Sequence, residues 1–314
     1  MIYDLQSLFS FFTRVNDPRH ARGKQYPLAL LLMLILLAKL CGENTPTGIA
    51  DWVTYRIEEL VEMKLLAKKR APCHMTYRRV LQLIVSPCDL ERLMSEYHQS
   101  SLQTGSEVVF SLDGKTVRGT IPTGETRGTH LLSLYVPEQG LVLVEARVDQ
   151  KENEIVVAPK ILKQVSLKGV IVIADAMHTQ RETSQQILQG GGEYLWMAKG
   201  NQARTKHHGY TRQTVYGLTS LTPEQASPMR LLALIRQYWD IETGLHCRRD
   251  VTLKEDATRL TLGNAGHIMA ILNNAVIGLC LQNGYHNLAQ ARRLFNAKPV
   301  LAFDLLCSTN IRSC

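Results

Sequence analysis

The sequence predicts an α/β protein in which an N-terminal helical module precedes a mixed five-stranded sheet flanked by helices. Three observations indicate this arrangement. Residues 1–104 read as successive helices separated by Gly and Pro, five short strand-like runs follow, and the chain then returns to long helical stretches. We therefore expect two units, a helical one over 1–104 and a sheet-containing one over 105–314.

Length and charge bound the class of protein. The chain has 314 residues, of which 45% are hydrophobic, enough for one large domain or two smaller ones. Lys and Arg number 36 against 28 Asp and Glu, so the formal net charge is +8. That balance suits a polyanionic partner such as nucleic acid, although a basic protein without such a partner has the same composition. The seven cysteines are odd in number and form no CxxC pair, which argues against a disulfide framework or a zinc site.

One wholly apolar run, residues 28–37, raises the question of a membrane segment. A membrane span needs about 20 apolar residues, so this run is too short and a buried helix is the better interpretation. The start of the chain is acidic and carries no secretory signal pattern. We expect a cytoplasmic protein with no membrane partner.

The helical module contains five expected helices and two groups of basic side chains. The helix containing the apolar run follows Pro27 and stops at Gly42, and the others are expected at about 47–53, 58–66, 76–84 and 89–102. The basic side chains of this module that are candidates for phosphate contacts are Lys68, Lys69, Arg70, Arg78 and Arg79. A solvated helix face would explain them equally well.

The second unit contains five strand-like runs, at 108–112, 131–136, 141–148, 169–174 and 194–198. The first three are joined by tight turns and should be antiparallel. The last two follow helical segments, at 154–165 and 179–188, and should be parallel. A mixed five-stranded sheet of this order with helices packed on it is the ribonuclease-H-like arrangement. After a polar stretch, helices are expected from about 230 past His246, at 265–281 and at 287–295.

Two of the expected strands end in an aspartate, Asp113 and Asp175. Ligands of open α/β sheets bind at the carboxyl ends of strands, so these side chains should lie close together at one edge. Close carboxylates repel one another unless a cation lies between them, and hard oxygen ligands suit Mg²⁺ or Mn²⁺. The alternative is that each aspartate simply caps the helix or turn that follows it.

The long helix supplies a third candidate carboxylate, Glu242. At steps of three and four residues it shares a face with apolar groups, where a carboxylate is costly unless it has a partner. A metal at the sheet edge would be that partner, and a salt bridge to Arg236 or Arg249 is the alternative. Asp240 and Asp250 lie off this face and are weaker candidates. The helical face consists of Ile235, Tyr238, Trp239, Glu242, Leu245, His246 and Arg249.

Several motifs, taken in order, carry a family resemblance. They are Asp17-Pro18-Arg19, Gly23-Lys24, Tyr26-Pro27, Ile49-Ala50-Asp51-Trp52, Ser111-Leu112-Asp113-Gly114-Lys115, Lys151, Asn153-Glu154-Ile155, Ala174-Asp175-Ala176-Met177-His178-Thr179-Gln180, Lys199-Gly200-Asn201-Gln202, and the helix segment Trp239, Ile241-Glu242, Leu245-His246 and Asp250-Val251-Thr252 with Glu255-Asp256. Over nearly its whole length the chain resembles the DDE transposases, in the branch that includes the H-repeat-associated proteins.

The resemblance implies that Asp113, Asp175 and Glu242 form the metal triad of a DNA-cleaving and DNA-joining enzyme. Two Mg²⁺ or Mn²⁺ ions would support in-line displacement at phosphorus, first by water and then by the freed 3′-hydroxyl. The implied partners are the transposon's terminal inverted repeats and target DNA, bound by a homodimer near the bacterial nucleoid. Lys115, Lys199 and Arg249 are the further candidates for phosphate contacts.

The sequence also departs from the family pattern. Tyr238 stands where relatives commonly carry His, and Thr243 and Cys247 stand where Asn and Trp are usual. The region of about 203–228 is short, because relatives carry a longer β-rich insertion there. These departures leave open a catalytically inactive, internally deleted transposase remnant that only binds DNA. A ribonuclease-H-like nuclease acting on another nucleic acid is a third hypothesis.

Overall fold

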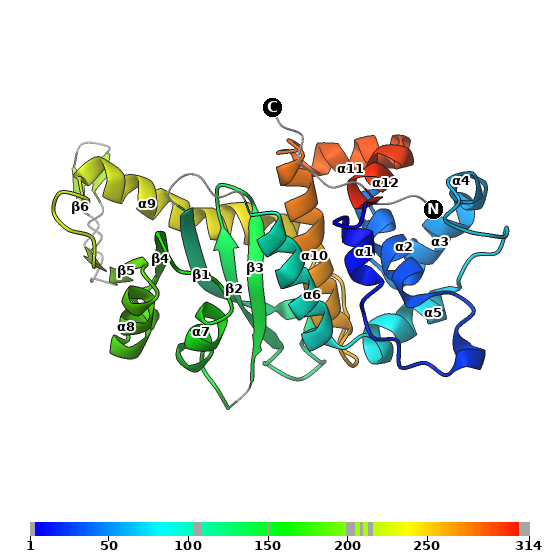
Figure 1. The fold of residues 1–314 in the computed structure, drawn as a ribbon, viewed down its shortest axis with the longest axis horizontal. Coiled ribbons are helices and arrows are strands. Elements are labelled where there is room, and N and C mark those ends of the chain that lie inside the picture. Colours follow the sequence, from blue (N-terminus) through cyan, green and yellow to red (C-terminus); the bar gives the residue numbers. More distant parts are fainter. Residues whose placement is uncertain are drawn as a thin grey trace.

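The protein is an elongated molecule with a sheet at one end and a helical bundle at the other (Figure 1). The computed structural model describes residues 4–102, 108–149, 151–198, 205–207, 210–212 and 216–307. Two long helices, α6 and α10, lie where the two ends meet (Figure 1).

The helical end is built from both termini of the chain. One apolar core joins residues from the first hundred positions, such as Leu31 and Trp52, to C-terminal residues such as Ile271 and Phe295. The helices are α1 (Leu8–Phe12), α2 (Leu28–Leu40), α3 (Pro46–Tyr55), α4 (Ile57–Glu62), α5 (His74–Arg79) with a π-helical extension η2 (Val80–Ile84), α6 (Pro87–Ser100), α10 (Ala265–Gln282), α11 (Leu288–Ala297) and α12 (Pro299–Cys307).

The apolar run forms helix α2 at the centre of this core. Leu31 to Leu40 are all buried, and the chain turns away at Gly42, whose φ of +117° suits a residue without a side chain. Two described helical segments are long and apolar enough to cross a membrane, Ala21–Leu40 and Ala265–Gln282, and 67% and 89% of them are buried inside the protein. The prediction of a buried helix at this position is confirmed.

The sheet has six strands in the order β3-β2-β1-β4-β5-β8. As predicted, β2 pairs antiparallel with β1 and β3, while β4 pairs parallel with β1 and β5. The sixth strand, β8, pairs antiparallel with β5 and was not predicted, because it is short and mostly exposed. The strands are β1 (Val108–Val117), β2 (Thr129–Val136), β3 (Leu141–Val148), β4 (Val170–Asp175), β5 (Glu193–Ala198) and β8 (Tyr216–Thr219).

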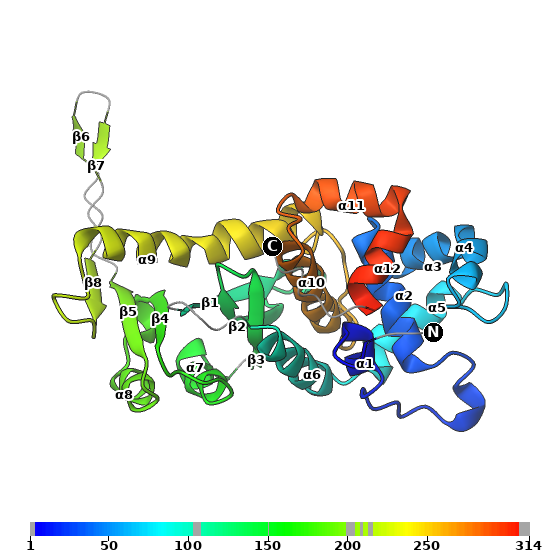
Figure 2. The same cartoon turned by 45° about the horizontal axis from the view of Figure 1, so that its top comes forward.

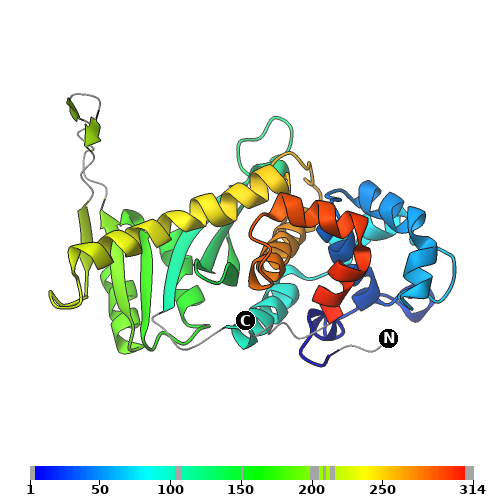
Figure 3. The ribbon, with the colours of Figure 1, turned by 90° about the horizontal axis from the view of Figure 1, so that it is seen from above.

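Helices cover both faces of the sheet. Helices α7 (Glu154–Leu162) and α8 (Arg181–Gln189) lie on one face, and α9 (Pro228–Asp240) crosses the other (Figure 3). The two short strands β6 (Thr205–His207) and β7 (Tyr210–Arg212) pair with each other apart from the main sheet (Figure 2). The face under α9 is the one toward which Asp113 and Asp175 point.

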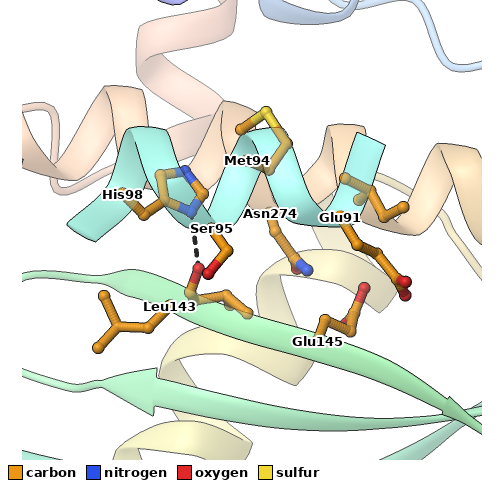
Figure 4. A pocket seen from close by; sticks show the side chains of 9 residues that line it. Glu91, Met94, Ser95, His98, Leu143, Glu145 and Asn274 are labelled. Carbon is orange, nitrogen blue, oxygen red and sulfur yellow. Dashed lines mark hydrogen bonds between the residues drawn. The ribbon is translucent and has the colours of Figure 1, made fainter. Parts of the chain in front are cut away.

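The two ends of the molecule meet where α6 and α10 pack on β3, around a cavity of about 20 Å³. Glu91, Glu145 and Asn274 point into this space (Figure 4). Beside it, the buried His98 donates from Nδ1 to the carbonyl oxygen of Val142, at 2.6 Å. Burial lowers the pKa of His98 to about 4, although the bond to Val142 opposes the change.

We expect His98 to make folding stability depend on pH. Its pKa is lower in the folded chain than in the unfolded chain, about 4 against 6.5, so the unfolded chain binds the proton more tightly. The contribution of neutral His98 to the free energy of unfolding is therefore fully present above pH 6.5 and is lost as the pH drops toward 4. The expected loss is about 2 kcal/mol between pH 7.5 and pH 5. Urea unfolding at the two pH values measures this loss. It should shrink in His98→Gln and persist in the exposed-histidine control His286→Gln. An equal loss in all three proteins would contradict this role of His98.

Candidate active site

Asp113 and Asp175 lie at the same level on neighbouring parallel strands. The register of β1 and β4 pairs Leu112 with Ala174, and the next residue of each strand is the aspartate. Leu112 and Ala174 belong to the core under α7 and α8. Because side chains alternate along a strand, both aspartates point to the opposite face, which α9 covers.

Strand β1 continues beyond Asp113, which differs from the prediction that the strand ends there. The parallel pairing with β4 stops at Leu112, but pairing with β2 runs on from Asp113 opposite Ser133 to Val117 opposite Thr129. Asp113 is therefore held by a strand that is hydrogen-bonded on the β2 side and open on the β4 side. Asp175 also caps the short helix η4 (Ala176–His178), since its Oδ1 accepts from the Met177 amide at 2.9 Å.

Helix α9 widens before it reaches the site. Beyond Asp240 the chain forms two π-helical segments, η5 (Ile241–His246) and η6 (Arg248–Thr252). Two residues depart from the helical face predicted from the sequence: Trp239, at the end of α9, is 53% exposed, and Ile241, the first residue of the widened segment, is buried. Helices widened in this way are frequent at functional sites. Here the widened segment brings Glu242 to the sheet.

Asp113, Glu242 and His246 form a tight cluster. One ligand atom of each lies within 4.8 Å of the others. Nδ1 of His246 is 3.6 Å from Oδ2 of Asp113 and 3.5 Å from Oε2 of Glu242. Asp175 is not part of this cluster, but its charge acts on Asp113 from the adjacent strand.

The electrostatics of the cluster suit a cation. Burial, together with the nearby charges of Glu242, Glu154 and Asp175, raises the pKa of Asp113 to about 7. The pKa of Glu242 is lowered by its interaction with His246, against the effect of partial burial. A partly buried carboxylate surrounded by other carboxylates is stabilised by a divalent cation, and carboxylate oxygens are the ligands that Mg²⁺ and Mn²⁺ prefer. The donor set therefore fits such an ion.

Glu154 is a fourth carboxylate near the site, to which the sequence analysis gave no role. Its carboxylate accepts from Nε2 of His130 at 2.8 Å and from Nε2 of His178 at 3.3 Å. Burial acts to raise its pKa, but the hydrogen bonds and charges of the two histidines prevail and lower the pKa to about 2. His130 is also bonded to Thr116 of β1. Glu154 therefore ties β1 and β2 to the segment that follows Asp175.

We expect Gly114→Ala to break this arrangement. A Cβ at this position would collide with the carboxylate of Glu154, which two histidines hold in place. The free energy of unfolding should fall by about 1–3 kcal/mol, measured by urea denaturation. Gly23→Ala is the matched control, because nothing lies near its added Cβ. Equal stability of the two variants would argue against the contact, whereas partial rescue of Gly114→Ala by Glu154→Ala would support it.

Two of the residues expected to contact phosphates, Arg249 and Lys115, form ion pairs within the protein. The side chain of Arg249 is fully buried and forms ion pairs with Glu145 and Glu255, each at 2.9 Å. Lys115 is 9% exposed, and its Nζ lies 2.7 Å from Oδ2 of Asp250. Both cations are therefore neutralised inside the protein. Lys199 lies outside the described residues.

The basic residues of the helical module are exposed, as a role in binding requires. Lys69 pairs with Glu58 at 2.6 Å. Lys68 and Arg70 line a groove of about 460 Å³ together with Tyr26 and Leu65. All five predicted candidates, Lys68, Lys69, Arg70, Arg78 and Arg79, are exposed.

Comparisons with protein families match both parts of the chain. The family model described as Transposase DDE domain matches residues 104–279, and the one described as DDE_Tnp_1-associated matches residues 9–98. Among curated proteins, the chain is 23% identical to the H repeat-associated putative transposase YhhI of Escherichia coli K12, over 88% of this chain and 90% of that protein. The putative transposase YncI of Escherichia coli O157:H7 is 24% identical over 88% of this chain and 87% of its own length.

The alignment with YhhI extends over 344 positions, more than the 314 residues of this chain, so the relative carries residues that this chain lacks. Among solved structures, the chain is similar to the piggyBac transposase in its synaptic complex with hairpin DNA. The TM-score is 0.50 at 10% identity, covering 95% of this chain and 77% of the other. At that identity the likeness concerns the fold, which is the ribonuclease-H-like arrangement expected from the order of the strands.

Proposed function

Because this chain belongs to the DDE transposase family, we propose that it cleaves DNA at transposon ends and joins the freed ends to target DNA, with Asp113, Asp175 and Glu242 holding the divalent cations. The observation that carries the proposal is the convergence of Asp113 and Glu242, from a strand and a distant helix, beside Asp175 on the next strand. The pKa of Asp113, raised to about 7, supports a site suited to positive charge.

The chemistry that two bound Mg²⁺ or Mn²⁺ ions supply is activation of the attacking oxygen and stabilisation of the leaving oxygen in an in-line displacement at phosphorus. The chain's own residues position the reacting groups. Asp113 is central, because both Glu242 and Asp175 act on it. Tyr238 is buried beside the site, and its pKa is raised by burial and by the charges of Asp113, Asp175 and Glu242. Rigid placement of this kind accounts for much of the catalysis of phosphoryl transfer.

DNA is the proposed partner. The net charge of +8 and the exposed basic residues of the helical module favour contact with phosphates. Lys68 and Arg70 line the same groove, which makes them the first pair to test. The proposed substrates are the terminal inverted repeats and target DNA. We also propose that a homodimer pairs two transposon ends, and that the protein acts in the cytoplasm at the nucleoid.

The test is cleavage of a labelled duplex that carries the element's own terminal repeat, in the presence and absence of Mg²⁺. Wild type is compared with Asp175→Ala, and a duplex with a scrambled end serves as the substrate control. The proposal predicts Mg²⁺-dependent cutting at the repeat by wild type alone. Equal cutting of the scrambled duplex would indicate a general nuclease. A folded, DNA-bound wild type that cuts neither duplex would contradict the proposal.

A further inference from the structure

We infer that His246 is a direct nitrogen ligand of the cation that Asp113 and Glu242 hold, an inference that rests on the proposed function. The site would then present two carboxylates and one imidazole to this cation, and would differ from an all-carboxylate site in the metals it favours. The geometry, the burial of the ring and the lack of other good partners support this assignment.

The distances around His246 are those of ligands that share an ion. Nδ1 is nearly equidistant from Asp113 and Glu242, at 3.6 and 3.5 Å. Both values exceed the usual 2.7–3.2 Å of a hydrogen bond from nitrogen to oxygen. Ligands bound at about 2.0–2.2 Å and separated by 90–110° lie roughly 3.0–3.6 Å apart. The two distances at Nδ1 are therefore long for hydrogen bonds and suitable for ligands that share an ion.

Burial makes the position of the ring costly without a further partner. The side chain of His246 is 6% exposed, and its Nε2 has no hydrogen-bond partner among the described residues. A buried polar group without good hydrogen bonds is unfavourable. A cation at Nδ1 would give the buried ring one strong partner on the side that faces Asp113 and Glu242, while Nε2 would stay unpaired. The ring is also held in place, since His246 lies on the same π-helical segment as Glu242, four residues on, and follows the buried Leu245.

An imidazole ligand changes the metal preference of a site. Transition metals from Mn²⁺ onward bind nitrogen ligands with increasing affinity, whereas Mg²⁺ is a harder ion that prefers oxygen. His246 should therefore favour Mn²⁺ over Mg²⁺. In His246→Asn, the amide oxygen of the new side chain would lie near the position of Nδ1 and replace a nitrogen ligand with an oxygen ligand. In His246→Asn we expect the preference for Mn²⁺ over Mg²⁺ to fall by about tenfold.

The experiment is pulsed electron paramagnetic resonance of Mn²⁺ bound to the full chain. The protein is produced in cells supplied with either ¹⁴N- or ¹⁵N-histidine. The inference predicts a nitrogen coupling that changes with the isotope and disappears in His246→Asn. The coupling should persist in His286→Asn, a change at an exposed histidine. Dissociation constants for Mn²⁺ and Mg²⁺, measured by calorimetry on the same proteins, test the change in preference.

The outcomes separate this inference from the proposed function. If Mn²⁺ binds to wild type, is lost in Asp113→Asn and shows no histidine coupling, the ligand role of His246 is overturned while the carboxylate site stands. An equal loss of affinity for both ions in His246→Asn would assign the ring a structural role instead. Failure of wild type to bind Mn²⁺ at all would overturn both proposals.

Discussion

Asp113→Asn is expected to lose at least about 10³-fold in DNA cleavage and yet to be more stable than wild type when divalent cations are absent. Cleavage falls because the amide is neutral and a poor metal ligand. Stability rises because the pKa of Asp113 is about 7 in the folded chain, against 3.8 for an ordinary aspartate. Its ionisation therefore opposes folding increasingly as the pH rises through 7. Removing the charge should add roughly 2–4 kcal/mol at pH 8.

Cleavage assays and urea unfolding at pH 8 and pH 5 check both parts. The gain in stability should shrink at pH 5, where the wild-type carboxyl is already protonated in the folded chain. Asp149→Asn is the matched control, since its side chain is 74% exposed and far less constrained. An Asp113→Asn protein that still cuts, or that is less stable than wild type at pH 8 without cations, would contradict the repulsive cluster.

Arg249→Met is expected to destabilise the fold by about 3–5 kcal/mol, because it leaves two buried carboxylates without their partner. The guanidinium of Arg249 bonds to Glu145 of β3 and to Glu255, and Asn273 of α10 donates to Glu255 at 2.7 Å. The network therefore joins the segment after Glu242 to the sheet and to the helical end. Loss of Arg249 should loosen the position of Glu242 as well as the fold.

Urea unfolding measures this effect beside Arg259→Ala, a control at an exposed arginine, which should change stability by less than about 0.5 kcal/mol. Arg249→Lys should recover only part of the loss, since an ammonium group cannot form the same paired hydrogen bonds. A phosphate-contact role makes the opposite prediction, namely normal stability with weaker DNA binding. That result would restore the contact expected from the sequence.

Much of the fold can be predicted from the sequence because its signals are local. The strands β1 to β5 are short apolar runs separated by turn residues or helices, and their antiparallel or parallel pairing follows from the length of each connection. The strand β8 lacks such a signal, since Tyr216–Thr219 is mostly exposed and pairs only at the sheet edge. The packing of α10, α11 and α12 on the N-terminal helices cannot be predicted from local sequence either, because it joins residues far apart in the chain.

The sequence predicts the carboxylates of the candidate site better than it predicts the residues around them. Asp113 and Asp175 follow buried runs, so their shared edge can be inferred from the strand pattern. The burial of Arg249 cannot be inferred in this way, because its partner Glu145 lies on a strand about 100 residues earlier in the chain. Glu154 stands in a motif of the sequence, but its role depends on two histidines brought together only by the fold.

We propose that the carboxylates of Asp113, Asp175 and Glu242 hold divalent cations. Thermal unfolding at pH 8 with increasing Mg²⁺ or Mn²⁺ tests this most directly. A cation that binds only the folded chain stabilises it, by about 2.7 kcal/mol at one hundred times the dissociation constant, and the melting temperature rises accordingly. We expect a clear rise for wild type, smaller rises for Asp175→Asn and Glu242→Gln, and almost none for Asp113→Asn. No rise in wild type, or the same rise in all four proteins, would contradict it.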